Sequence, residues 1–476
     1  MEVKHFKKKY LEALKDDTAA IFAGAGLSVS SGYVNWKELL RNIVDEIGLN
    51  IDKETDLIAV AQYHRNKYQT RSVINQTIIT EFTKSAEITE TLKILSKLPI
   101  KYFWTTNYDN LIEKALEENG KKIDVKITQG NLAVNIPKRD AIIYKMHGDI
   151  SIPEEAVITK DDYETYNIKR QLFTTALQGD LISKTFLFIG FSFNDPNLDY
   201  ILSRIRILLD ENCRQHFAFF KNINRDDFQD EEEYRYEVIR QKLKIEDLKR
   251  YSIAVISINE YEEIKSILSN IEELYNLNKI FISGSAKAYG AWKELDATSF
   301  IYKLAKGLIK SNYKVISGFG EGVGINVING ALAEIYTSKF KNLNEYLEIW
   351  PFPQIASSAN EKEKMWELHR QNMILSSGIA IFIFGNKEEN GIIKNADGVY
   401  REFEIARDNK KYIIPINSTG YMAQVIFNEI KKEIKNYDYL KKHLDCLEKE
   451  TDTEVLIKCI LQIIDDIKAK NIKGDD

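Results

Sequence analysis

The chain has 476 residues, more than one hydrophobic core usually supports, so we expect two or three domains. Its 66 basic and 71 acidic residues leave a net charge of −5, which gives no general attraction to nucleic acid or to an anionic membrane. Its three cysteines, Cys213, Cys446 and Cys459, form no CxxC pair, which excludes a four-cysteine zinc site and favours a reducing compartment.

Six short apolar runs in the first half predict strands. They are rich in β-branched and aromatic residues and do not alternate with polar residues, which is typical of strands buried on both faces of a parallel sheet. Helical patterns lie between them, for example at residues 35–48 and 108–120. The order of elements predicts an α/β sheet with helices on both faces. The predicted strands are residues 18–24, 101–107, 141–148, 185–192, 216–221 and 252–259.

An amphipathic helix is predicted at residues 261–275, and a second α/β series follows it. We therefore place a boundary near residue 276 and expect two Rossmann-like domains, residues 1–275 and 276–476. The charged stretch 421–470 predicts helices that pack on the second domain or on a neighbouring subunit. The strands predicted in the second half are residues 279–286, 313–320, 346–353, 379–386 and 411–417.

The sequence contains no obvious targeting signal. No apolar run approaches the ~18 residues needed to span a bilayer. The basic start MEVKHFKKKY lacks the apolar core of a signal peptide. We expect a soluble, cytoplasmic protein.

Unusual residues follow four predicted strands of the first half. Because parallel strands end at one edge of a sheet, these residues are expected to meet there. That edge would carry glycines, an amide, a carboxylate and an imidazole, and this agreement is stronger than any single motif. The four strand ends are Gly24-Ala25-Gly26, Asn107-Tyr108-Asp109, His147-Gly148-Asp149 and Gly190-Phe191-Ser192.

The first glycine loop has two readings. Gly24 and Gly26 could let the backbone approach a diphosphate at the start of a helix, whose N–H groups and dipole favour an anion. The alternative is a tight strand–helix turn without a ligand. The third position of a dinucleotide fingerprint is Val29 rather than glycine, and no GK[ST] follows. A hydride-transfer enzyme is therefore a poor fit.

The polar residues at the other strand ends also have two readings. His147 could accept a proton at neutral pH, or it could be a structural imidazole. Asn107 could cap the next helix, and Asp109 could serve its first turn. Their joint position at one edge of the sheet favours a catalytic role over the structural and capping roles.

Four segments, in this order, resemble the sirtuin catalytic domain over roughly residues 10–260. They are FAGAGLS, TTNYD, MHGD and GFSFNDPNL. Two departures matter: Thr106 stands where protein deacylases usually have glutamine, and the cysteines of their zinc module are missing. The resemblance therefore favours the bacterial sirtuin-like NAD hydrolases over the deacylases.

This resemblance implies cleavage of NAD+ to nicotinamide and ADP-ribose without a metal. Asn107 and Asp109 would position the nicotinamide amide, the ribose or the attacking water, and His147 would accept a proton. The expected NAD+-binding residues are Gly24, Ala25, Gly26, Ser28, Gly190, Ser192 and Asp195.

Residues 277–476 resemble the SLOG family of Rossmann-like nucleotide-sensing domains. The order of a sirtuin-like and a SLOG domain resembles the NAD-consuming effectors of bacterial Thoeris antiphage systems. This implies that a cyclic ADP-ribose isomer, made by a partner TIR-domain protein upon infection, binds the SLOG domain, switches on NAD+ hydrolysis and depletes cellular NAD+. It also implies a homotetramer or a larger assembly.

The signal-binding residues expected from this second resemblance lie at glycine turns and on charged segments. Arg370 and Lys387 could pair with a diphosphate, and Glu402 could accept hydrogen bonds from ribose hydroxyls. Each charged residue could instead be a solvated surface charge. The expected set is Gly284, Ser285, Gly318, Gly320, Gly322, Arg370, Lys387 and Glu402.

Two other functions stay open at this point. One is a deacylase or ADP-ribosyltransferase, which also consumes NAD+. The other is a nucleotide sensor without catalysis, which would not need an imidazole at the reaction edge.

Overall fold

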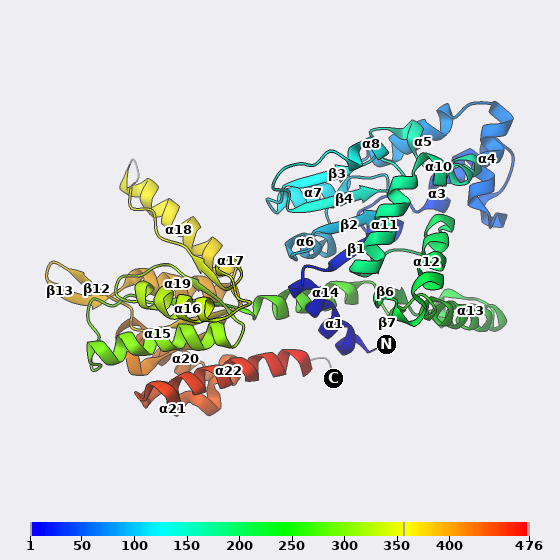
Figure 1. Cartoon of the computed structure of the whole chain (residues 1–476). Coiled ribbons are helices and arrows are strands. Elements are labelled where there is room, and N and C mark those ends of the chain that lie inside the picture. The colour runs from blue at the N-terminus through cyan, green and yellow to red at the C-terminus, as the bar shows by residue number, and fades with distance from the viewer. Residues whose placement is uncertain (1, 356–357, 474–476) are drawn as a thin grey trace. The chain divides into compact units, whose positions relative to one another are not determined.

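The computed structural model describes residues 2–355 and 358–473, and its packing divides the chain into two compact units, Met1–Glu272 and Glu273–Asp476 (Figure 1). Each unit contains one parallel sheet with helices packed on it, so the predicted α/β class is confirmed. Within the described ranges, no helix is long and apolar enough to cross a membrane.

The first unit is built on a seven-stranded parallel sheet in the order β3-β4-β2-β1-β5-β6-β7. All six predicted strands are present. The edge strand β3 was not predicted, because its buried positions are Asp124 and Lys126, which form an ion pair, rather than apolar residues. The strands are β1 (Ala19–Ala23), β2 (Tyr102–Thr105), β3 (Ile123–Lys126), β4 (Ala141–Lys145), β5 (Thr185–Ile189), β6 (His216–Lys221) and β7 (Ile253–Ile258).

Helices cover both faces of this sheet. Successive side chains of a strand point to opposite faces, so Phe22 and Trp104 join a core with α11 and α12, whereas Ile21 and Phe103 lie beside α6 and α7. The α-helices that begin in this unit are α1 (Val3–Lys15), α2 (Ala25–Val29), α3 (Trp36–Glu46), α4 (Leu57–Tyr68), α5 (Ser72–Phe82), α6 (Glu90–Lys97), α7 (Leu111–Glu118), α8 (Gln129–Leu132), α9 (Lys160–Glu164), α10 (Tyr166–Lys169), α11 (Gln171–Ser183), α12 (Pro196–Leu209), α13 (Glu231–Lys249) and α14 (Glu262–Asn276).

The position of β1 explains where a ligand can bind. The chain runs from β1 to β2 on one side and later returns to β5 on the other side of β1. The strand order therefore reverses at β1, and in open parallel sheets ligands bind beyond the carboxyl ends of the strands at such a point.

The second unit repeats this plan with a five-stranded parallel sheet in the order β10-β9-β8-β11-β14, so β8 takes the place of β1. The five predicted strands are confirmed, but the antiparallel hairpin β12–β13 was not predicted, because it is short and mostly polar. The strands are β8 (Lys279–Ser283), β9 (Lys314–Ser317), β10 (Leu347–Ile349), β11 (Ile379–Phe382), β12 (Asn386–Glu389), β13 (Ile392–Asn395) and β14 (Tyr412–Pro415).

The predicted helix α14 is present, and its apolar stripe, which includes Leu268 and Ile271, is buried. The charged tail is helical and packs on the second unit, because α22 contacts α15. The remaining α-helices are α15 (Glu294–Lys310), α16 (Gly324–Thr337), α17 (Leu343–Tyr346), α18 (Ala359–Leu375), α19 (Asp397–Asp408), α20 (Tyr421–Lys432), α21 (Leu444–Lys449) and α22 (Thr453–Lys473). The 3-10 helices are η1 (Ile51–Lys53), η2 (Pro153–Glu155), η3 (Asp210–Asn212), η4 (Arg225–Asp227), η5 (Asn417–Thr419) and η6 (Ile434–His443).

Candidate functional site

The loops after β1 and β5 pack backbone against backbone. The N–H of Gly24 donates to Ile189 O and that of Gly26 to Gly190 O, both at 2.9 Å. A Cβ atom on Gly26 would lie 2.8 Å from Gly190 Cα, and one on Gly190 would lie 2.3 Å from Leu27 N. These glycines are thus required by the close approach of the two loops.

This packing limits how the first loop could hold a phosphate. The N–H groups of Gly24 and Gly26 already have acceptors inside the protein. The helix that follows, α2, is only five residues long, so its dipole is weaker than the sequence suggested. The N-cap position Gly24 also offers no side chain. The N–H groups of Gly24 and Gly26 are therefore not free to bind a phosphate.

Asn107, Ser28 and Asp109 form one buried network, although they come from two different strand ends. Asn107 Nδ2 donates to Gly24 O at 3.0 Å and to Ser28 Oγ at 2.9 Å, and Ser28 Oγ donates to Asp109 Oδ2 at 2.7 Å. Since a carbonyl oxygen can only accept, the Gly24 contact fixes which way the amide points. The other oxygen of Asp109 accepts from Leu111 N at 3.0 Å. Asp109 therefore holds Ser28 and the start of α7.

His147 lies at the end of β4 with only 3% of its surface exposed. Its Nε2 is 3.2 Å from Asp195 Oδ2, close enough for an ion pair, but the two groups are not aligned as a hydrogen bond, and Nε2 has no hydrogen-bond partner within the described ranges. Burial lowers the pKa of His147 more than Asp195 raises it, and Arg170 lowers it further. The imidazole is therefore neutral at pH 7 and can accept a proton.

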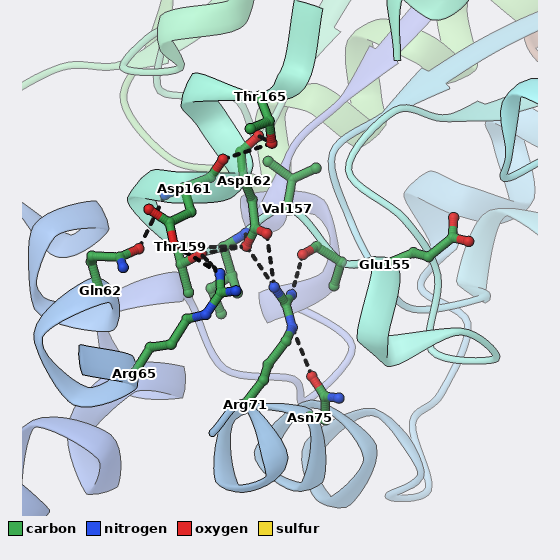
Figure 2. A network of polar contacts seen from close by, with 12 residues as sticks. Gln62, Arg65, Arg71, Asn75, Glu155, Val157, Thr159, Asp161, Asp162 and Thr165 are labelled. Carbon is green, nitrogen blue, oxygen red and sulfur yellow. Dashed lines mark hydrogen bonds and ion pairs between the residues drawn. The ribbon is translucent and has the colours of Figure 1, made fainter. Parts of the chain in front are cut away.

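Two tyrosines from the segment between β4 and β5 lie beside this histidine, and Arg71, from the helical segment between β1 and β2, binds a residue next to one of them. The rings of Tyr163 and Tyr166 lie 5.5 Å and 6.0 Å from the imidazole, centre to centre. Tyr163 is on α9, next to Asp162. Arg71 Nη1 donates to the two carboxylate oxygens of Asp162 at 2.9 Å and 2.7 Å, and Figure 2 shows this contact from close by. Burial would raise the pKa of Asp162, but Arg71 and Thr159 outweigh it and the pKa is lowered. No sequence motif marked Arg71.

A buried lysine beside the site was also missed. Lys145 is fully buried and contacts Asp149 and, at 3.0 Å, Glu113 Oε1. Burial would lower the pKa of Lys145, but the two carboxylates outweigh it and the pKa is raised. A lysine inside the apolar run AIIYKM was the available signal, because a charge in a buried strand needs a partner.

Ser192, another expected NAD+-binding residue, lies at the solvent edge of its loop. It is exposed, and its carbonyl oxygen accepts a hydrogen bond from Lys244 at 2.6 Å. Ala25 is half-buried at the start of α2. Asp195 caps α12 by accepting from Leu198 N at 2.9 Å, which holds its carboxylate beside His147.

In the second unit, three glycine loops pack against one another at the equivalent edge. A Cβ atom on Gly284 would lie 2.3 Å from Ile383 O, and one on Gly320 would lie 2.1 Å from Gly284 O. Gly322 has a φ of +70°, and a Cβ atom there would lie 2.0 Å from Ala286 O. These loops form the same kind of backbone contact as in the first unit.

Ser285 and an unpredicted asparagine join two of these loops. Ser285 Oγ donates to Asn386 O at 2.8 Å. The buried Asn386 side chain accepts from Lys287 N at 2.8 Å and from Ala288 N at 3.0 Å. Asn386 directly follows Gly385 after the apolar strand β11 but was not among the predicted site residues, whereas Asn107 was predicted from its position at a strand end.

Arg370 and Glu402 are brought together, but Lys387 is not part of the pair. Glu402 accepts from Ser283 Oγ at 2.5 Å and lies 3.9 Å from Arg370 Nε. That Nε atom is buried and has no hydrogen-bond partner in the parts of the chain that the structure describes. Burial raises the pKa of Glu402 to about 7. Lys387 is half-exposed and pairs with Asp397 at 2.8 Å.

Aromatic rings complete this second site. The guanidinium of Arg370 lies 5.1 Å from the centre of the Phe352 ring and 5.7 Å from that of Trp366. A Cβ atom on Gly318 would lie 3.1 Å from the Phe352 ring, so the Gly318 loop borders the same place. The described residues contain no group of three or more histidine, cysteine, aspartate or glutamate side chains placed to hold a metal ion.

Comparisons with known proteins cover nearly the whole chain. The profile of a SIR2-like domain matches residues 101–245, and that of the STALD family, the Sir2- and TIR-associating SLOG family, matches residues 263–467. The NAD(+) hydrolase ThsA of Cytobacillus dafuensis is 47% identical over 439 residues, 90% of this chain and 88% of that protein. The NAD(+) hydrolases ThsA of Bacillus cereus and Enterococcus faecium are 46% and 42% identical, over 91% and 98% of this chain and 91% and 100% of those proteins. The chain therefore belongs to the ThsA family of NAD(+) hydrolases.

Proposed function

We propose that residues 1–275 form a domain that hydrolyses NAD+ to nicotinamide and ADP-ribose. The observation that carries this proposal is the buried Nε2 of His147, which has no hydrogen-bond partner within the described residues and lies 3.2 Å from the Asp195 carboxylate. A neutral imidazole in this state can take a proton from water, and the nearby carboxylate stabilises the resulting cation.

In the proposed reaction, a water oxygen forms a bond to C1′ of the nicotinamide ribose while the C1′–N bond breaks. The electron pair of that bond leaves with nicotinamide, and the water proton passes to His147. Asn107 Oδ1, which makes no hydrogen bond in the described part of the chain, is the group proposed to hold the water or the ribose. Asp109 and Ser28 act by fixing the Asn107 amide.

We further propose that residues 276–476 bind a cyclic ADP-ribose isomer and thereby switch on hydrolysis. Three features support a diphosphate and ribose ligand: the Nε of Arg370, which has no hydrogen-bond partner among the described residues, the neighbouring Glu402, and the glycine loops. The match to a Sir2- and TIR-associating family supports a TIR-domain protein as the source of the signal. The proposed setting is cytoplasmic antiphage defence by NAD+ depletion, in a homotetramer or larger assembly.

The test is to incubate NAD+ with the purified chain, with and without cyclic ADP-ribose isomers, and to separate the products by chromatography. Signal-dependent nicotinamide and ADP-ribose support the proposal. Nicotinamide only with a protein acceptor would indicate a transferase or deacylase, and no turnover under any condition would indicate a sensor. Asn107→Ala and His147→Ala should each abolish nicotinamide release.

The signal site has its own test. Arg370→Ala should remove activation without changing the fold of the first domain, because Arg370 lies in the second unit. An unchanged response of this variant at the same signal concentration would place the signal site elsewhere.

A further inference from the structure

Lys145 ends β4, and its side chain is completely buried. Its Nζ donates to the backbone oxygens of Asp109 and, at 3.3 Å, of Tyr108, and it forms an ion pair with Asp149. The first two acceptors belong to the loop after β2, and the third belongs to the loop after β4. One ammonium group therefore joins the loop that carries the candidate amide to the loop that carries the candidate imidazole.

The fourth oxygen around this ammonium is Glu113 Oε1, at 3.0 Å. Glu113 lies on α7, which begins directly after the loop that carries the amide. An ammonium has three N–H groups to share among these four oxygens, and all four come from segments next to the candidate site, so Lys145 holds those segments together through one buried group. Because the Lys145 ammonium is buried, water cannot take its place, so removing it leaves the carboxylates of Glu113 and Asp149 buried without their cation.

We infer that Lys145 is a positioning residue for NAD+ hydrolysis, which sets the separation between Asn107 and His147 without touching substrate. This inference rests on the proposed function of the first domain. The opposing interpretation is that Lys145 serves stability alone.

Lys126 provides a matched comparison for a purely structural buried lysine. It lies on β3 in the same sheet, is 2% exposed, and its Nζ is 2.8 Å from Asp124 Oδ1. It also donates to Val134 O, and it bonds to neither of the loops that carry Asn107 and His147. Loss of Lys126 should therefore affect stability without moving those loops.

The experiment compares Lys145→Met and Lys126→Met in the full-length chain, activated by the cyclic ADP-ribose isomer that gives most turnover. We expect Lys145→Met to lower kcat about 100-fold with KM for NAD+ little changed, since a displacement of about 1 Å can have this effect. Lys126→Met should lose thermal stability but keep its kcat. Equal losses of kcat in the two variants would overturn the inference.

A charge-neutral variant separates positioning from stability. Lys145→Met combined with Glu113→Gln and Asp149→Asn removes the buried charges together and should recover much of the thermal stability. The kcat of this triple variant should stay low, because no ammonium then donates to Asp109 O and links the loop after β2 to the loop after β4. Recovery of kcat together with stability would overturn the inference.

Hydrogen–deuterium exchange gives a readout that does not depend on turnover. Exchange should be faster in residues 106–111 and 147–152 of Lys145→Met, and unchanged there in Lys126→Met. If the wild-type chain released no nicotinamide, the proposed function would fail, but this exchange pattern would still support the joining of the loops by Lys145. Unchanged exchange in these residues of Lys145→Met would overturn the inference that Lys145 joins the two loops.

Discussion

Gly190→Ala tests whether the site depends on the backbone contact between the loops after β1 and β5. Gly190 has a φ of +63°, and an added Cβ would lie 2.3 Å from Leu27 N and 2.7 Å from Gly26 C. The left-handed backbone costs an L-residue about 1–2 kcal/mol, and overpacking costs about 1–3 kcal/mol. We therefore expect Gly190→Ala to lower the free energy of unfolding by about 2–5 kcal/mol and to reduce NAD+ hydrolysis.

Two other glycines of the same unit separate these contributions. Gly120 has a φ of +72° with open space around it, so Gly120→Ala should show only the backbone cost, about 1–2 kcal/mol. Gly179 lies inside α11, also with open space, so Gly179→Ala should stabilise by about 0.5–1 kcal/mol. The measurements are thermal unfolding and hydrogen–deuterium exchange of residues 19–29. If Gly190→Ala were no more destabilising than Gly120→Ala, the reasoning from close packing would be refuted.

Three further predictions concern buried polar groups. Ser28→Ala removes the hydrogen bond to the Asp109 carboxylate, which should cost roughly 1–3 kcal/mol of stability and slow nicotinamide release. Thermal unfolding and a product assay measure these two effects, and wild-type values for both would contradict the hydrogen-bond network. Because burial lowers the pKa of His147 below its usual 6.5, kcat should hold as the pH falls from about 8 to 6.5, and an acid limb above pH 7 in the pH–rate profile would contradict this. Burial raises the pKa of Glu402 from 4.5 to about 7. Protonation of Glu402 therefore contributes about 3 kcal/mol to the free energy of unfolding below pH 4.5, and this contribution is lost as the pH rises through 7. Glu402→Gln, which can still bond to Ser283, should flatten this pH dependence in thermal unfolding of the second unit, and an unchanged slope would show that Glu402 is not its source.

Most of the fold could be predicted from the sequence, because strands buried on both faces leave continuous apolar runs. The exceptions have physical reasons. The edge strand β3 buries the ion pair between Asp124 and Lys126 instead of apolar side chains, so its sequence carries no apolar run. The hairpin β12–β13 is polar and lies outside the main sheet.

For the candidate site, the sequence predicted which residues lie at the same edge of the sheet but not which of them contact one another. The rule that parallel strands end at one edge placed Asn107 and His147 there. It could not show that Ser28 would bond to Asp109, 81 residues away, because that depends on loop geometry and not on strand order. Lys145 is a similar case: its place in an apolar run indicated that it needs a partner, but the sequence could not show that its partners come from three different segments.

The glycine contacts in both sheets have a mechanical consequence. Where Gly24 and Gly26 meet Gly190, and where Gly284 meets Gly320, no side chain lies between the main chains to absorb a displacement by changing rotamer. A displacement of one loop should then displace the strand end beside it by nearly the same amount. We therefore expect the loops at each sheet edge to move together when a ligand binds, so that ligand-induced changes spread across neighbouring strands instead of staying within a single loop.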